Sequence, residues 1–233
     1  MLAFFTRLPF GKKVVYTEKK FIEGLWTFPF TGSVIGAFLT LPYLIIGIDS
    51  AFRGVIVILT YLFLTGGIHL DGLADSCDGL FSNRSKTRVL EIMKDSHIGT
   101  FGVIALILYF LCFYVGAIKV AWLWLLMMPF VGKSLGYISA GFSRYARDDI
   151  GMGYLFINQI TRKHSLIYFT LLIIIIMSTL GIYGLFALCG AILAMLYLMN
   201  LTKKVIGGQT GDTVGMTIEI SQIAFLLGGV LFS

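Results

Sequence analysis

Three aspartates recur at helical spacing in the stretch GGIHLDGLADSCDGLF, which runs from Gly66 to Phe81. If this stretch is a helix, Asp71, Asp75 and Asp78 lie on one face, within roughly 60° of one another. Like charges placed so closely repel one another, and a bound divalent cation removes that conflict. Because Mg²⁺ prefers oxygen ligands and commonly joins carboxylates to substrate phosphates, this face is a candidate magnesium site.

A second pair of carboxylates, Glu91 and Asp95, follows four residues apart in EIMKDSHIG. Two acidic helix faces that converge on one or two metal ions would clamp the attacking and leaving oxygens of a phosphoryl transfer. The alternative is a solvated acidic loop that pairs with the neighbouring lysines and arginines. His69 is a weaker candidate ligand, because Mg²⁺ disfavours nitrogen.

A glycine-rich stretch, KKVIGGQTGDTVG, runs from Lys203 to Gly215. Its glycines, with Thr210, Asp212 and Thr213, can form a nest of backbone N–H groups that binds phosphate. It is not a Walker A loop, because no Gly-Lys-Ser/Thr follows. A plain connection between two helices is an equally good interpretation.

A third polar stretch reads SRYARDDIGMGYLF. Arg144 and Arg147 are candidates for binding phosphate, and Tyr145 is a candidate for stacking on a ring. A solvated loop is the alternative interpretation of this stretch.

The elements that must position these residues are membrane spans. The chain has 233 residues, of which 58% are hydrophobic and only 13% charged, and its mean hydropathy is +0.91. A soluble domain of this length cannot bury so much apolar surface. The sequence therefore predicts an all-α, polytopic integral membrane helix bundle that forms one domain over residues 1–233. About seven transmembrane helices are expected, each of about 20 residues, near 28–47, 51–68, 99–118, 120–138, 165–181, 184–200 and 217–233.

Positive charge alternates sharply between the two sides of this bundle. Fifteen of the eighteen Lys and Arg residues lie in the N-terminal segment and in segments 69–98, 139–164 and 202–216. The positive-inside rule places this side in the cytoplasm, so these last three segments are expected to be cytoplasmic catalytic loops of a cell-membrane protein. The net charge of +6 then reflects topology and anionic-lipid contact rather than a nucleic-acid partner.

Several motifs in register resemble the cobalamin synthase family. They are GGIHLDGLADSCDGLF, then RVLEIMKDSHIGTFGV, then GGQTGDTVG with Glu219 after it, together with FFTRLPF near the start and YARDDIGMGYLF in the middle. The resemblance covers nearly the whole chain. It implies a Mg²⁺-dependent membrane transferase, an adenosylcobinamide-GDP ribazoletransferase of the late vitamin B12 pathway. One departure is His97, which stands where the family usually has arginine.

The reaction implied by the resemblance is a phosphoryl transfer. The 3′-hydroxyl of α-ribazole, or of its 5′-phosphate, attacks the cobinamide-side phosphate of adenosylcobinamide-GDP, and GMP leaves. The resemblance carries the family's acidic motif onto Asp71, Asp75, Asp78 and Asp95. It carries the glycine-rich, substrate-binding motif onto Gly207, Gly208, Thr210, Gly211 and Asp212.

The residue patterns and the family resemblance together support one hypothesis for the mechanism. Mg²⁺ is expected to bind among the five carboxylates of the two acidic faces, and one carboxylate, with Asp95 preferred, takes the proton of the attacking hydroxyl. Lys94 and Arg88 are expected to stabilise charge on the transferred phosphoryl group, as Arg84 also could, and Arg147 is expected to bind substrate.

Two alternatives remain open. The acidic region distantly resembles the CDP-alcohol phosphotransferase signature, although the expected Ala-Arg after the glycine is absent. A divalent-cation transporter is the second alternative, and it would need ionisable groups near the middle of its spans. Nearly all of the ionisable residues are predicted at one rim, with Lys133 as the main exception. The expected partners are the two substrates and the lipid bilayer, and a homo-oligomer remains possible.

Overall fold

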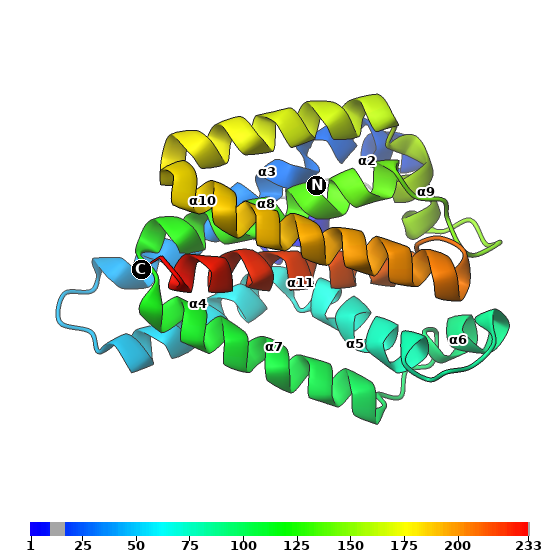
Figure 1. The fold of residues 1–233 in the computed structure, drawn as a ribbon, viewed down its shortest axis with the longest axis horizontal. Coiled ribbons are helices and arrows are strands. Elements are labelled where there is room, and N and C mark those ends of the chain that lie inside the picture. Colours follow the sequence, from blue (N-terminus) through cyan, green and yellow to red (C-terminus); the bar gives the residue numbers. More distant parts are fainter. Residues whose placement is uncertain (10–16, 233) are drawn as a thin grey trace.

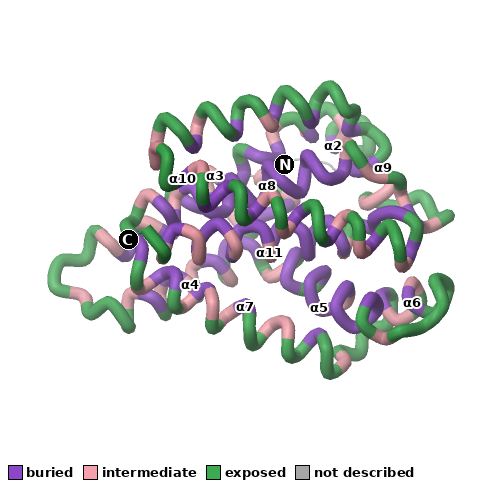
Figure 2. The backbone as a smooth tube through the Cα atoms, in the orientation of Figure 1, coloured by how far each residue is buried: buried purple, intermediate pink, exposed green. Residues whose placement is uncertain are grey.

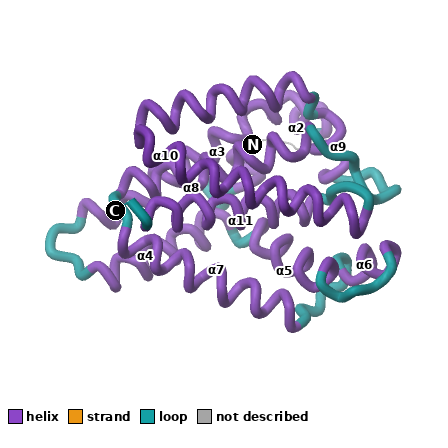
Figure 3. The backbone as a smooth tube through the Cα atoms, viewed as in Figure 1, coloured by secondary structure: helices purple, strands orange, loops and turns teal. Residues whose placement is uncertain are grey.

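The chain folds into a bundle of helices (Figure 1). The structure is a computed structural model, and it describes residues 1–9 and 17–232. Lys12 and Lys13, two of the predicted cytoplasmic charges, lie outside the described residues. The helices are α1 (Leu2–Phe5), α2 (Glu18–Gly24), η2 (Leu25–Thr27), α3 (Phe28–Thr40), η3 (Leu41–Leu44), α4 (Ser50–Thr65), α5 (Ile68–Leu80), α6 (Lys86–Ile92), α7 (Thr100–Lys119), α8 (Trp122–Gly141), α9 (Met152–Gln159), α10 (Arg162–Ile206) and α11 (Gly211–Val230). Figure 3 shows helices and loops throughout the described part of the chain.

The lengths and apolar character of these helices confirm a multi-pass membrane protein. Five helical segments can cross a membrane, and α4 with α5 forms a sixth that is bent by 91°. The longest segment, α10, contains Gly181 in a non-helical conformation with φ 62° and ψ −150°. Figure 1 shows that α10 doubles back into two arms, which correspond to the predicted spans 165–181 and 184–200. The arrangement agrees with the expected bundle of about seven transmembrane helices.

Two helices, α8 and α11, form the centre of the bundle. In the 18-residue apolar stretch with which each helix could span a membrane, 89% of the residues of α8 and 72% of those of α11 are buried, against 28% for α7 and for α10. Figure 2 shows the same contrast, with buried residues along α8, α11 and α5 and exposed residues along the outer arm of α10. In a bilayer the exposed apolar side chains of the outer helices contact lipid.

A sharp break separates α4 from α5. Gly66 and Gly67 have φ values of 63° and 75°, a left-handed conformation that glycine adopts without strain. The break redirects the chain, so α5 packs against α7 and α11 and most of its residues are buried. The helix that carries the three aspartates is therefore part of the bundle and not a surface loop.

The last helix begins earlier than the sequence suggested. The prediction placed the last span at 217–233, but α11 begins at Gly211. Thr210 is its N-cap and forms a capping box with Thr213, which satisfies backbone donors of the first turn. The early start places Glu219 two turns inside α11, where it is 1% exposed. Glu219 is therefore enclosed by the helices of the bundle.

Candidate functional site at one end of the bundle

Two polar stretches that are distant in sequence are joined by backbone hydrogen bonds. An isolated parallel bridge pairs Tyr145 with Gln209. The N–H of Ala146 donates to the oxygen of Gln209 at 2.9 Å, and the N–H of Gln209 donates to the oxygen of Arg144 at 2.8 Å. This bridge holds the 143–150 loop beside the start of α11.

A guanidinium lies against a carboxylate where these stretches meet. Arg147 Nη2 donates to Asp212 Oδ2 at 2.9 Å, and Thr210 Oγ1 donates to the same oxygen at 3.3 Å. The side chains of Arg147 and Asp212 are only 15% and 29% exposed. Arg147 Nε is buried without a hydrogen-bond partner among the described residues. A buried donor of this kind is unfavourable when unpaired, and an anionic ligand would satisfy it.

The aspartates of α5 lie beside this pair. Gly72 allows the approach, because a Cβ at that position would lie 2.8 Å from the backbone oxygen of Asp212. Asp75 is half-buried and lies within electrostatic range of Asp71, Asp212 and Asp78, and of the Arg147 guanidinium. The structure thus confirms that the aspartate stretch is helical, and it adds Asp212 of α11 to the group.

Asp78 has a structural partner of its own. Its Oδ2 accepts the N–H of Gly99 at 2.7 Å, and its Oδ1 accepts the N–H of Gly102 at 2.9 Å. These amides belong to the N-cap and first turn of α7, so Asp78 caps that helix from α5. Each carboxylate oxygen keeps a second lone pair that could still bind a ligand.

The second acidic pair is exposed and bound to its neighbours. Glu91 Oε2 accepts from Arg88 Nη1 at 2.8 Å, so the predicted cation Arg88 is paired here with a predicted ligand. Asp95 Oδ1 lies 2.6 Å from His97 Nδ1 and accepts the backbone N–H of His97. These bonds hold the pKa of Asp95 below its usual value.

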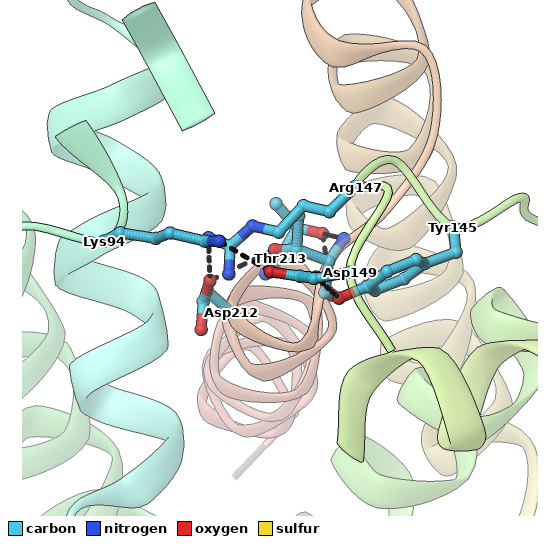
Figure 4. Close-up of polar contacts among 7 residues, drawn as sticks. Lys94, Tyr145, Arg147, Asp149, Asp212 and Thr213 are labelled. Carbon is cyan, nitrogen blue, oxygen red and sulfur yellow. Dashed lines mark hydrogen bonds and ion pairs between the residues drawn. The ribbon is translucent and has the colours of Figure 1, made fainter. Parts of the chain in front are cut away.

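Lys94 connects α6 to the 143–150 loop. Its Nζ lies 2.5 Å from Asp149 Oδ2, and Tyr145 Oη donates to Asp149 Oδ1 at 2.9 Å. Both bonds, with that from Lys94 the stronger influence, lower the pKa of Asp149. Figure 4 shows Lys94, Asp149 and Tyr145 pointing toward one another above the start of α11, with Arg147 directed at Asp212. Nothing in the sequence distinguishes Asp149 from its neighbour Asp148.

The oxygen ligands of the site suit Mg²⁺, but the side chains that carry them do not surround a common point where the ion could bind. Asp71, Asp75 and Asp212 offer hard carboxylate oxygens, which Mg²⁺ prefers. Within the described residues, however, no three His, Cys, Asp or Glu side chains are placed so that they could hold a metal ion. Metal binding here would require side-chain movement or oxygens supplied by a substrate.

Three cavities surround the 143–150 loop. The first, which we call the aromatic cavity, measures about 410 Å³ and includes Arg147, Gly211 and Asp212 in its lining. The second, the basic cavity, measures about 660 Å³. It is lined by Gly141, Phe142, Ser143, Arg144, Arg162, Met199, Asn200, Lys203, Gly207 and Gly208. The third measures about 330 Å³ and lies between α6 and the loop, with Glu91, Lys94 and Arg147 in its lining. The predicted glycine-rich site is therefore divided, because its first two glycines and its last two residues line different cavities.

A buried polar cluster, which reaches His69 in the lining of the aromatic cavity, was not predicted from the sequence. Tyr61 Oη donates to Glu219 Oε1 at 2.7 Å, and Gln222 Nε2 donates to Glu219 and, at 2.7 Å, to Tyr61 Oη. Lys133 Nζ lies 3.4 Å from His69 Nδ1. The signal in the sequence was the ionisable residues inside apolar stretches, since such residues are costly in a membrane and need partners.

The fold and the site define a class: a multi-pass helical membrane protein with carboxylates, a guanidinium and a glycine-rich turn gathered at one end of its bundle. The chain belongs to the Cobalamin-5-phosphate synthase family, whose model matches residues 1–230. This membership confirms the resemblance carried by the sequence motifs.

Curated relatives match along nearly their whole length. The chain is 39% identical to the adenosylcobinamide-GDP ribazoletransferase of Alkaliphilus oremlandii, over 99% of this chain and 95% of that protein. It is 36% identical to the protein of the same name from Acetivibrio thermocellus, over 100% and 96% of the two chains. It is also 36% identical to that of Citrobacter koseri, over 97% and 96%. No solved structure matches the chain significantly.

Proposed function

We propose that this protein is an adenosylcobinamide-GDP ribazoletransferase of cobalamin biosynthesis. It joins α-ribazole, or α-ribazole 5′-phosphate, to the cobinamide-side phosphate of adenosylcobinamide-GDP and releases GMP. The family membership and the full-length similarity to proteins of that name support this activity.

The strongest structural support for this activity is the largely buried guanidinium of Arg147. Arg147 is held against Asp212 beside the aspartate helix, yet its buried Nε has no partner among the described residues. A phosphoryl oxygen is the natural acceptor for such a donor, because guanidinium groups bind phosphate through several N–H groups at once. A phosphate bound there would lie close to Asp75, where a reacting hydroxyl could lose its proton.

The reaction then uses the following groups. Arg147 orients the cobinamide-side phosphate and stabilises the negative charge that develops on it. The 3′-oxygen of the ribose forms a bond to this phosphorus, the bond to the bridging oxygen breaks, and GMP leaves with that oxygen. Asp75 is the carboxylate best placed to accept the hydroxyl proton, because it is half-buried beside the guanidinium. This assignment replaces Asp95 as the preferred base, since Asp95 is bound to His97 at the surface.

Magnesium is proposed as the metal of this site, with Asp71, Asp75 and Asp78 as its candidate ligands and Asp212 as an additional one. When bound, Mg²⁺ neutralises charge on the pyrophosphate. The active site is proposed to face the cytoplasm, because the loops around it carry most of the basic residues. Lys94 is proposed to act indirectly, by holding the loop that carries Arg147 through its contact with Asp149.

GMP release tests the proposal. The full chain, reconstituted in lipid vesicles with Mg²⁺, is expected to release GMP from adenosylcobinamide-GDP only when α-ribazole or its 5′-phosphate is present. Asp75→Asn is expected to abolish this turnover while the protein still inserts and folds. Asp148→Asn, an exposed aspartate in the loop next to Asp149, is the matched control and should remain active.

Other outcomes would favour the alternatives. CMP release from a CDP-alcohol would identify a phospholipid-forming enzyme instead. Mg²⁺ uptake into sealed vesicles without nucleotide turnover would identify a transporter. Near-normal GMP release by Asp75→Asn would show that Asp75 neither binds metal nor accepts the proton.

A further inference from the structure

The aromatic cavity has an interior suited to a flat apolar ring. Its lining includes five phenylalanines from the N-terminal segment and from α2, α3 and α9, namely Phe4, Phe5, Phe21, Phe28 and Phe156. Its volume of about 410 Å³ lies within the range of roughly 300–1,000 Å³ that is typical of small-molecule sites. The same cavity reaches Arg147 and Asp212 of the proposed reaction site. A ligand here could place a ring among the phenylalanines and a polar group near the guanidinium.

The lining also contains polar side chains, and one of them, His69, packs directly against two of the phenylalanines. His69 is 7% exposed and is stacked on Phe5, with ring centroids 5.6 Å apart and an interplanar angle of 21°. It also meets Phe28 edge-on at a centroid distance of 6.3 Å. Packing on both sides fixes the plane of the imidazole ring.

The buried polar cluster fixes which ring nitrogen of His69 carries the proton. Lys133 Nζ lies 3.4 Å from His69 Nδ1, and an ammonium group can only donate. Nδ1 therefore accepts, and the neutral ring carries its proton on Nε2. Glu219, whose Oε1 lies 3.9 Å from Nδ1, also lies within electrostatic range of Lys133 and supplies its counter-charge. Within the described residues, His69 makes hydrogen-bonding or ionic contact only through Nδ1, so Nε2–H is free to bind a ligand.

We infer that the aromatic cavity binds the bicyclic base of the ribazole acceptor and that His69 Nε2–H donates to the unsubstituted ring nitrogen of this base. The inference rests on the proposed function. A dimethylbenzimidazole ring is flat and apolar, and it has one nitrogen with a free lone pair, which matches one donor among phenylalanines. The ribose then lies on the side of Arg147 and Asp212, where its 3′-hydroxyl reacts.

The test compares two acceptors and two proteins in reconstituted vesicles. One acceptor is α-ribazole, and the other is the α-riboside of dimethylindole, in which a C–H replaces the accepting nitrogen. The wild-type chain is expected to show a KM for the indole riboside about 10-fold or more above that for α-ribazole, because the His69 donor is left unpaired. His69→Phe keeps an aromatic ring but has no donor, so it should use the two acceptors with equal KM.

Two further variants separate binding from folding. His69→Gln retains an N–H donor and is expected to restore part of the discrimination between the acceptors. Phe63→Ala, which removes a phenylalanine that is 73% exposed on α4, is the control and should discriminate as the wild type does. The KM for adenosylcobinamide-GDP should be unchanged by His69→Phe.

The possible outcomes are distinct. Equal use of both acceptors by the wild type, or undiminished discrimination by His69→Phe, would overturn the inference while GMP release upheld the proposed function. If the wild type released no GMP from adenosylcobinamide-GDP with α-ribazole, the proposed function and the inference would both fail. Because the comparison is a ratio of two acceptors on one protein, partial misfolding of a variant does not change its meaning.

Discussion

Replacing Asp78 with alanine is expected to destabilise the protein, because this carboxylate caps α7 from a neighbouring helix. Its two oxygens accept the N–H groups of Gly99 and Gly102 at 2.7 and 2.9 Å, and the residue is 9% exposed. The first N–H groups of a helix have no partner within the helix. Alanine would leave both amides without an acceptor in a site that admits little water.

The expected size follows from these two bonds. Removing an N-cap lowers stability by about 0.5–2 kcal/mol, and a hydrogen bond to a charged group contributes about 1.5–3 kcal/mol. Because the two bonds share one carboxylate and are not additive, we expect a loss of about 2–4 kcal/mol. For a chain of this size each kcal/mol shifts Tm by about 2–4 °C, so Tm should fall by about 5–15 °C. Asp78→Asn keeps one acceptor oxygen and should lie between the wild type and the alanine variant.

Thermal unfolding in detergent without Mg²⁺ measures this effect. Asp71→Ala is the matched control, because Asp71 lies on the same helix but is exposed, and its Tm should not fall. The Mg²⁺ dependence of GMP release should be measured on Asp78→Asn in parallel. If Asp78→Ala melts at the wild-type temperature, the capping interpretation is wrong. If Asp78→Asn instead keeps its Tm but needs much more Mg²⁺, the main role of Asp78 is metal binding.

Four further substitutions test three other sets of contacts. Gly72→Val is expected to separate α5 from α11 and to abolish GMP release, because its Cβ would lie 2.8 Å from a backbone oxygen of α11; an active variant would refute this close approach. Lys133→Met and Glu219→Gln should each lower stability by about 3–5 kcal/mol, whereas the double variant should recover part of the loss, as thermal unfolding of all four proteins would show. Asp149→Asn should increase amide hydrogen exchange in the 143–150 loop at neutral pH. The bond to Lys94 holds the pKa of Asp149 in the folded protein below its usual value of 3.8. In the wild type the contact therefore stabilises the loop above pH 3.8 and is lost as the pH falls through the folded pKa. If neither the Asp149→Asn substitution nor the fall in pH increased hydrogen exchange in the loop, this role of Asp149 would be contradicted.

The membrane architecture could be predicted because apolar stretches of span length are a local signal. The hairpin in α10 was predicted as two spans, 165–181 and 184–200, and the non-helical residue Gly181 is the last residue of the first of them. The bend between α4 and α5 could not be predicted. The two glycines Gly66 and Gly67 can adopt the left-handed conformation that breaks the helix. The direction of the chain after the break, however, depends on packing against α7 and α11. Segment 69–98 was therefore expected as a loop, although much of it is the buried helix α5.

The site was predicted by residue type but not by pairing. Arg147 and Asp212 were both selected from the sequence, yet their contact spans 65 positions and has no local signature. The same holds for Glu219, whose partner Tyr61 is 158 positions away. Side-chain pairing depends on which helices become neighbours, and single-sequence periodicity does not carry that information.

The aspartates at this end of the bundle differ in whether other residues already donate hydrogen bonds to their carboxylates. Asp78 is bound by two backbone amides, and Asp212 is bound by Arg147 and Thr210. Within the described part of the chain, neither Asp71 nor Asp75 accepts a hydrogen bond from another residue. A carboxylate near a membrane that lacks such a partner is unfavourable unless a ligand supplies one. Because Asp75 is half-buried and Asp71 is exposed, Asp75 carries the greater penalty, and we expect it to be the aspartate on which turnover depends most.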